Sequence, residues 1–267
     1  MGGTAEFDGA LVSVLQHRPA DCEVLVVHTE PYDDPYNLAD EVSFIETSGN
    51  SLIELVNASL DLATSDVLHI VGCGLEATER WTDAALEHFN DPDVAAVSPL
   101  VMSDSGELIS AGLSWTLGGN RRVLKNPRIA SPGAGTLASQ DLGPTLQAAF
   151  YRREVLVALG GFDIHVGDSL ADADLALAIR SLGRAHHAEP AARLIQVGTA
   201  PQPAVGKFST GRASERLFWR YAAGNGVALS LGFHALSIRR RIDRAPLGRR
   251  PCRPGYGSIG NRCHSTS

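Results

Sequence analysis

A cysteine and two histidines are the side chains in this sequence that most readily suggest a metal ion. Cys73 lies between Gly72 and Gly74, and His186 directly precedes His187. A thiolate and an imidazole are common ligands of soft and borderline metal ions. A lone thiol between glycines also fits a small buried residue, and a histidine pair ahead of a strand also fits the protein surface. The second interpretation is simpler in both cases, so no metal site is predicted on these residues.

Two carboxylates begin a predicted helix. Asp172 and Asp174 precede an apolar stretch that stops at Gly183, which predicts a helix over residues 172–182. Aspartate is a strong N-cap, and a second acid in the first turn complements the helix dipole. Capping by Asp172 is therefore one interpretation, and it does not exclude a second, chemical role.

Charge is distributed unevenly along the chain. Residues 1–120 hold 21 acidic and two basic side chains, and the remainder holds nine acidic and 21 basic ones. Seven arginines between Arg239 and Arg253 follow an apolar stretch at residues 227–236. Such a segment fits an anionic membrane surface or simply a solvated basic helix. No interleaved aromatic residues or known motif support nucleic acid as the partner, so we expect none.

Length and composition favour a globular protein. The chain has 267 residues, of which 44% are hydrophobic and 20% charged, enough for a sizeable core. No apolar run approaches the roughly 20 residues of a spanning helix, and the first residues do not form a secretory signal. The four cysteines form no C-x-x-C pair, which favours reduced thiols. We expect a cytoplasmic protein, with peripheral contact at the inner face of the membrane left open by the arginines.

The first half alternates short β-branched runs with helical patterns, which predicts an α/β domain with a mostly parallel sheet covered by helices. Strands are predicted at residues 23–28, 42–46, 67–71 and 94–98, and helices at residues 10–16, 52–62 and 81–89. Residues 103–143 predict hairpins and loops, followed by a helix at 152–159, a strand at 193–197 and a helical pattern at 211–242 that is interrupted around residues 224–226. We divide the chain into a main domain (residues 1–205), a helical extension (206–244) and a flexible tail (245–267).

Residues 145–183 carry an ordered series of motifs. A strand of small residues leads through Arg152-Arg153 and a helix to the turn Gly160-Gly161-Phe162-Asp163, and then to Asp172-Ala173-Asp174-Leu175 and Arg180. This series resembles the signature of family 2 glycosyltransferases with the GT-A fold, and the resemblance extends over residues 6–200. It implies a GT-A-like, Rossmann-like α/β fold.

The resemblance implies transfer of a sugar from a nucleotide-sugar donor to a hydroxyl of a polysaccharide, lipid-linked or cell-envelope glycan acceptor, usually with Mg²⁺ or Mn²⁺ on the diphosphate. By its position in the series, Asp172 matches the general base that takes the acceptor's proton. The acceptor side is expected to include Gly160, Gly161, Phe162, Asp163 and Asp174. The donor side is expected to include Asn57, Gly72, Cys73 and Gly74, although Asn57 also fits a role in pinning a loop.

The sequence departs from the family where the metal ion would bind. After the strand at 67–71 the family carries Asp-x-Asp, and this chain carries Gly72-Cys73-Gly74. Gln196 stands where a late histidine would complete the metal shell, and Ala171 replaces the glutamate before Asp172. No cofactor is therefore predicted. Two hypotheses remain: a transferase that works without this metal turn, with Arg121, Arg122 or Lys125 holding the diphosphate, or a catalytically inactive relative that serves as a binding or scaffold module.

A strand is also missing relative to the family. The resemblance places a strand before the helix that starts at residue 7, at the centre of the sheet. Without it, two neighbouring strands would each keep an unpaired edge. The expectation is either a truncated start or another segment in that place.

Overall fold

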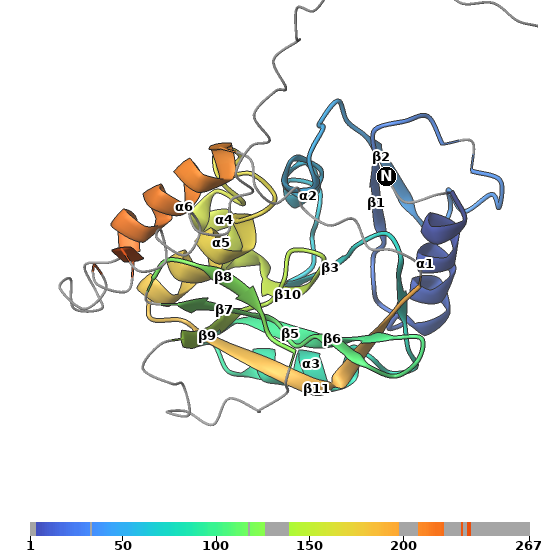
Figure 1. The fold of residues 1–267 in the computed structure, drawn as a ribbon. Helices are drawn as coiled ribbons and strands as arrows, with labels where there is room; N and C mark the ends of the chain where they lie inside the picture. The colour runs from blue at the N-terminus through green and yellow to red at the C-terminus, as the bar shows by residue number, and fades with distance from the viewer. Residues whose placement is uncertain are drawn as a thin grey trace, which may run out of the picture.

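The computed structural model describes residues 4–32, 34–116, 118–125, 139–197, 208–221, 231 and 234–235. Figure 1 shows the elements in chain order. They are α1 (Thr4–His17), β1 (Leu25–His28), β2 (Ser43–Glu46), α2 (Leu52–Leu60), β3 (Val67–Val71), β4 (Leu75–Ala77), α3 (Asp83–Glu87), the 3-10 helix η1 (His88–Asn90), β5 (Val94–Ser103), β6 (Leu108–Ser110), β7 (Leu113–Thr116), β8 (Arg121–Val123), β9 (Ser139–Gly143), β10 (Ala148–Arg152), α4 (Arg153–Leu159), α5 (Ala171–Ser181), β11 (Ala185–Gln196) and α6 (Phe208–Tyr221).

The central sheet has the strand order β3-β10-β5-β11-β4, with β6 paired to β5. Strand β10 runs antiparallel to both β3 and β5, β11 is parallel to β5, and β4 is antiparallel to β11. The α/β class is confirmed, but the expectation of a mostly parallel sheet is wrong. The returning strands β10 and β4 make the sheet mixed, because each meets its neighbours in the opposite direction.

Strands β1 and β2 form a separate parallel pair. Helix α1 packs on this pair through Leu11, which joins Val26 and Val42 in a small core. Within the described residues, β1 pairs only with β2, and β3 pairs only with β10. Among the described residues, each of these two strands therefore keeps one edge without a strand partner.

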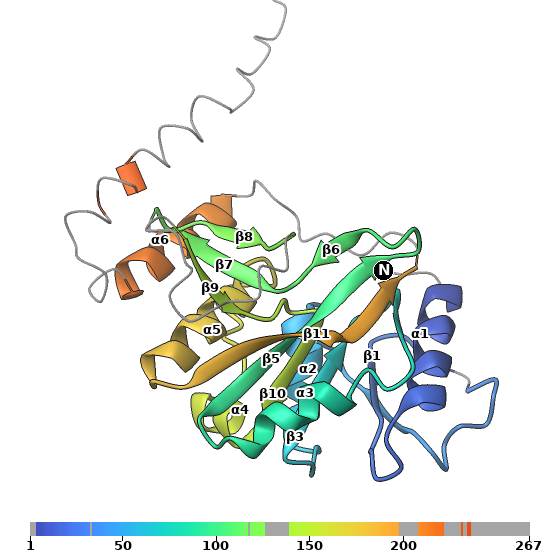
Figure 2. The same cartoon turned by 90° about the horizontal axis from the view of Figure 1, so that it is seen from below.

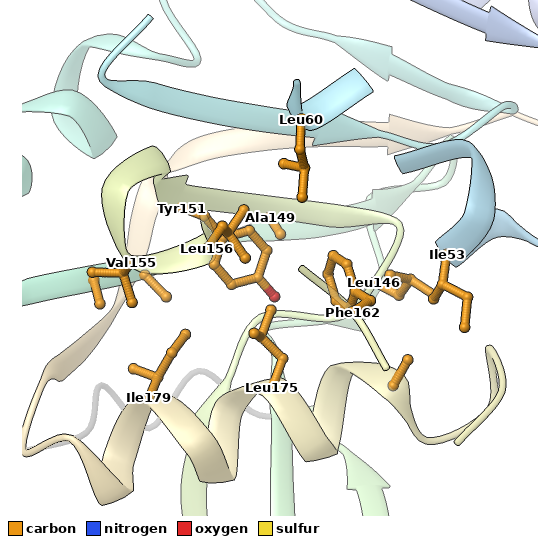
Figure 3. Packing of buried hydrophobic residues seen from close by; sticks show 13 residues of the cluster. Ile53, Leu60, Leu146, Ala149, Tyr151, Val155, Leu156, Phe162, Leu175 and Ile179 are labelled. Carbon is orange, nitrogen blue, oxygen red and sulfur yellow. The ribbon is translucent and has the colours of Figure 1, made fainter. Parts of the chain in front are cut away.

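Helices cover both faces of the central sheet (Figures 1 and 2). Alternate residues of β10 serve the two sides: Tyr151 packs with α2, α4 and α5, and Phe150 packs with α3 and β11. Figure 3 shows the first of these cores, in which Leu175 and Ile179 of α5 face Tyr151 and Leu156. This packing fixes α5 against the sheet and so positions the acidic start of the helix.

A small antiparallel sheet, β8-β7-β9, lies beside the central one. Leu113 and Trp115 of β7 share a core with Ala173 and Leu177 of α5 and with Leu217 of α6. The start of α5 is thus enclosed by the hairpin of β7 and β8 on one side and by α6 on another.

The predicted elements match the structure unevenly. Strand β3 has the predicted bounds, and α4 ends at Leu159 as predicted, followed by Gly160 in a left-handed conformation. Strand β11 begins at Ala185, so the histidine pair lies inside a strand rather than before one; His187 is exposed, and Nε2 of His186 lies 2.8 Å from Oγ of Ser98. The interruption at 224–226, the arginine-rich segment 239–253 and the tail fall outside the described residues. No helix in the described part of the chain is both long and apolar enough to cross a membrane.

Candidate functional site

Asp172 is tied to the β7–β8 hairpin rather than to its own helix. Helix α5 starts at Ala171, and its N-cap residue Leu170 forms no side-chain cap. The interpretation of Asp172 as the N-cap of the helix is therefore wrong. Its Oδ1 accepts a hydrogen bond from Nε of Arg121 at 2.7 Å, and its Oδ2 accepts from Nη2 of Arg121 at 2.5 Å and from the N–H of Leu146 at 3.1 Å.

This ion pair is largely buried, with the carboxylate more completely so than the guanidinium. The side chain of Asp172 is 1% exposed and that of Arg121 is 19% exposed. Burial lowers the pKa of Arg121, but the hydrogen bonds and the charge of Asp172 raise it, and the net effect is a rise. Burial, and then the charge of Asp172, raise the pKa of Tyr151 well above its usual range. The buried hydroxyl of Tyr151 forms no hydrogen bond within the described residues, so it lies in the core in its neutral form.

Asp174, two residues further along α5, faces α6. Its Oδ1 accepts hydrogen bonds from Nη1 of Arg220 at 3.1 Å and from the hydroxyl of Tyr221 at 3.4 Å. Burial and the nearby charge of Asp163 raise its pKa, and the charge of Arg220 opposes that rise, with a net upward shift. A carboxylate with a raised pKa holds a proton more readily, which is the property of a general base.

The turn before α5 is held by Asn57. Its Nδ2 donates to the carbonyl of Phe162 at 2.8 Å, and its Oδ1 accepts from the N–H of Phe162 at 2.9 Å. Gly160 and Gly161 both have φ near +77°, at +78° and +76°, and a Cβ on Gly161 would lie 2.5 Å from Oδ1 of Asn57. The Asn57 amide therefore fixes the backbone that leads to Asp163.

Asp168 is a connection that the sequence analysis missed. Its carboxylate accepts hydrogen bonds from the N–H groups of Leu52 at 3.0 Å and Ile53 at 3.2 Å. These are the first residues of α2, where backbone donors lack partners within the helix. Together with Asn57, Asp168 joins α2 to the loop that precedes α5.

The turn after β3 meets the end of β11. The N–H of Gly72 donates to the carbonyl of Gln147 at 2.8 Å, and the carbonyl of Gly74 accepts from the N–H of Val197 at 2.9 Å. Burial and the charge of Glu6 raise the pKa of Cys73, which keeps this thiol protonated. A protonated thiol is a poor metal ligand.

Two consecutive residues connect this turn to the acidic helix start. Leu146 donates its N–H to Asp172, and Gln147 accepts a hydrogen bond from Gly72. The structure thereby brings the candidate donor-side turn and Asp172 to the two sides of one short segment. Asn57 contacts the acceptor-side loop and is not part of this link.

The partners Arg121, Leu146 and Arg220 could not be identified from spacing alone. Arg121 precedes Asp172 by 51 residues and Arg220 follows Asp174 by 46 residues. The one available signal was the pair Arg121-Arg122 within the region predicted to form hairpins and loops. An inward-pointing arginine in a strand requires an acidic partner.

No family model matches the chain, and no curated protein matches its sequence. Its fold does match solved structures. The structure of GalNAc-T7 with UDP, GalNAc and Mn²⁺ aligns over 80% of this chain with a TM-score of 0.61 and 13% identity. The mannosyltransferase PcManGT from Pyrobaculum calidifontis, in complex with GDP-Man and Mn²⁺, aligns over 92% of this chain and 73% of its own, with a TM-score of 0.51 and 18% identity.

These likenesses show that the chain has the fold of GT-A glycosyltransferases. The alignment with GalNAc-T7 covers 45% of that protein's chain, so less than half of its length has a counterpart here.

Proposed function

We propose that this protein is a glycosyltransferase of the family 2 type, which binds a nucleotide-sugar and transfers the sugar to an acceptor hydroxyl. The carrying observation is the fold, which aligns over most of the chain with two structures that contain nucleotide or nucleotide-sugar ligands. The motif series at residues 145–183 supports the assignment to family 2. Neither comparison supports the alternative of a catalytically inactive relative. The titration described below would favour that alternative only if the folded protein bound no nucleotide.

In the proposed reaction the acceptor oxygen attacks the anomeric carbon of the donor sugar. The bond from that carbon to the phosphate oxygen breaks, the nucleoside diphosphate leaves, and a carboxylate takes the acceptor's proton. The family resemblance points to Asp172 as that carboxylate. The surroundings favour Asp174, because Asp172 is held by three hydrogen bonds in a buried ion pair, whereas the arginine bound to Asp174 is 56% exposed and burial raises the pKa of Asp174. We infer that Asp172 positions Arg121 and the hairpin, and that Asp174 accepts the proton.

The residues do not fit the Mn²⁺ ion that both neighbouring structures contain. The turn Gly72-Cys73-Gly74 offers no carboxylate. Over the described ranges, no three His, Cys, Asp or Glu side chains are placed to hold a metal ion together. Hard divalent cations require several oxygen ligands. No step of the proposed reaction is therefore assigned to a metal ion.

Calorimetric titration of the full chain with UDP, GDP, UDP-GalNAc and GDP-Man, each with and without Mn²⁺, tests donor binding. We expect one nucleotide to bind with an affinity that Mn²⁺ does not change. Binding that requires Mn²⁺ would contradict the account of the altered turn. No binding to any of the four, in a protein whose circular dichroism shows it to be folded, would favour the catalytically inactive relative.

Two isosteric variants then separate the carboxylates. If Asp174 is the base, Asp174→Asn lowers the turnover number about 100- to 10,000-fold while donor affinity is retained. Asp172→Asn should instead lower the free energy of unfolding, and any loss of activity should follow the loss of folded protein. Asp93→Asn, which removes an exposed carboxylate elsewhere, is the control. A loss of turnover in a stable Asp172→Asn protein would return the role to Asp172.

A further inference from the structure

The outer face of α6 carries a basic and aromatic surface. Arg212, Arg216 and Trp219 follow one another at i, i+4 and i+7, a spacing that places them on one side of a helix. All three are exposed, and Trp219 is 59% exposed. The opposite side of α6 is buried through Ala213 and Leu217, which pack with α5 and β7. Both views of the fold place α6 at the periphery of the molecule (Figures 1 and 2).

The two arginines of this face make no polar contacts within the described structure. Neither Arg212 nor Arg216 forms a hydrogen bond or ion pair with any described residue, whereas Arg220, one residue past Trp219, is paired with Asp174. The single acid of the helix, Glu215, bonds to His234 through both carboxylate oxygens at 3.0 Å. In the part of the chain that the structure describes, no carboxylate therefore pairs with the two arginines of the outer face.

This charge belongs to a wider asymmetry of the chain. Residues 208–267 contain 11 arginines and two acids, Glu215 and Asp243, whereas residues 1–120 contain 21 acids and two arginines. An anionic surface would repel the first half and attract the end that begins with α6. The charge distribution thus sets an orientation as well as an attraction.

The exposed indole distinguishes between anionic partners. A purely basic face fits nucleic acid and anionic lipid equally well. Tryptophan is typical of the membrane–water interface, where its ring lies at the level of the headgroups, and arginine extends its apolar stem beside it. Because the apolar side of α6 is already buried against α5 and β7, the contact with a bilayer would be made at the level of the headgroups, by the two arginines with Trp219 between lipid headgroups.

We propose that Arg212, Arg216 and Trp219 dock the protein on an anionic lipid bilayer, with α6 lying parallel to the membrane surface. This surface is distinct from the acidic start of α5 and does not depend on the proposed reaction. The inner side of the same helix contacts Asp174 through Arg220 and Tyr221, so docking would place the bilayer on the outer side of α6, away from Asp174.

Tryptophan fluorescence makes the test specific, because the other two of the three tryptophans are buried: Trp81 is 3% exposed and Trp115 is 9% exposed. The full chain is mixed with vesicles of phosphatidylcholine alone, or of phosphatidylcholine with about 30% phosphatidylserine, and both co-sedimentation and emission are recorded. We expect sedimentation only with the anionic vesicles, together with a blue shift of the emission that Trp219→Phe abolishes.

The double variant Arg212→Gln/Arg216→Gln measures the contribution of the face. Two interfacial arginines correspond to about a 30-fold lower partition coefficient. Arg80→Gln/Arg193→Gln, which removes two exposed arginines that lie outside α6, is the control for net charge and should bind like the original protein. Unchanged binding of the first variant, or vesicle binding without an emission shift, would overturn the proposal by assigning the contact to another segment. Failure to sediment with anionic vesicles, or tighter binding to a DNA or RNA duplex than to vesicles, would also overturn it.

Discussion

Two ion pairs at the start of α5 use the same residue types and differ in their surroundings. Asp172 and Arg121 have side chains that are 1% and 19% exposed, and they share two hydrogen bonds. Asp174 and Arg220 have side chains that are 9% and 56% exposed, and they share one hydrogen bond. The first pair joins α5 to the β7–β8 hairpin, and the second joins α5 to α6.

The difference in exposure indicates that the Asp172–Arg121 pair stabilises the fold, whereas the Asp174–Arg220 pair can open and take part in a reaction. A buried, doubly bonded pair cannot release either partner without leaving a charge in the core, so it fixes the geometry. A pair with one solvated partner can open at little cost, and its carboxylate is then available. The raised pKa of Asp174, caused first by burial, makes its ionised carboxylate a stronger proton acceptor.

The largest effect is expected from breaking the buried pair. Arg121→Met leaves the carboxylate of Asp172 buried without its cation and should lower the free energy of unfolding by about 3–5 kcal/mol, measured by urea denaturation. The double variant Arg121→Met/Asp172→Leu removes both charges and should recover most of that loss. If the double variant is as unstable as the single one, the hairpin depends on packing by Arg121 rather than on the ion pair.

The next largest loss in the free energy of unfolding is expected in the loop that carries Asp163 and leads to α5. Gly161→Ala must accept both a φ of +76° and a Cβ 2.5 Å from Oδ1 of Asn57. Backbone strain and overpacking together predict a loss of about 2–4 kcal/mol. Gly160→Ala is a matched control, since its φ is +78° and its Cβ would meet no atom within 4 Å. It should cost about 1–2 kcal/mol in the same denaturation experiment. Equal losses would show that Asn57 moves aside freely.

His69 extends the comparison to a buried ionisable group without any partner. Its ring stacks on Phe150 at a centroid distance of 3.7 Å, and neither buried ring nitrogen forms a hydrogen bond within the described residues. Burial lowers its pKa well below the usual value. Replacing it with a phenyl ring of similar shape, His69→Phe, removes the two unpaired nitrogens and should raise the free energy of unfolding by about 1–3 kcal/mol at pH 7.

The gain from His69→Phe should grow in acid. Below pH about 6.5 the unfolded chain binds a proton on His69 that the folded chain does not, so the original protein loses about 1.4 kcal/mol per pH unit from this group. The variant lacks this proton, and its stability should fall less steeply between pH 6.5 and about 5. Parallel curves for the two proteins would mean that His69 is protonated in the folded state.

The sequence predicted those parts of the fold that depend on local patterns. Strand β3 follows from its β-branched run, and the end of α4 follows from Gly160, which adopts the left-handed conformation that glycine tolerates. The acidic start of α5 was also predicted, although the helix begins at Ala171, one residue before the predicted start. Its cap was misread, because a long-range ion pair to Arg121 replaced the local hydrogen bond that aspartate usually makes at a helix start.

The contacts of the site depend on residues distant in the sequence. Strand β11 runs from Ala185, although its first half carries a Pro and two His that locally argue against a strand. The strand pairs with β5 on both sides of an irregularity between Glu189 and Arg193, and Pro190 lies within that irregularity. Likewise, the role of Asn57 follows from a loop more than 100 residues away, at Phe162, which periodicity alone cannot reveal.

The smallest loss in the free energy of unfolding is expected for the pair of Asp174 and Arg220. This prediction tests whether the carboxylate of Asp174 is free to open from its arginine. The charge of Arg220 lowers the pKa of Asp174, against the larger effect of burial. Arg220→Gln removes this charge, so the pKa of Asp174 should rise further. At pH 7 the loss in the free energy of unfolding should be at most about 1 kcal/mol, since the arginine is mostly solvated.

The pH dependence identifies the group responsible for that loss. Because the folded-state pKa of Asp174 lies above its unfolded value, ionisation costs stability as the pH rises, and Arg220→Gln increases that cost. Below pH about 3.9, where Asp174 is protonated in both states, the variant and the original protein should be equally stable. Urea midpoints measured from pH 7 down to that limit should converge. A difference that persists in acid would show that Arg220 acts through packing against α5, and the exposed pair would then resemble the buried one.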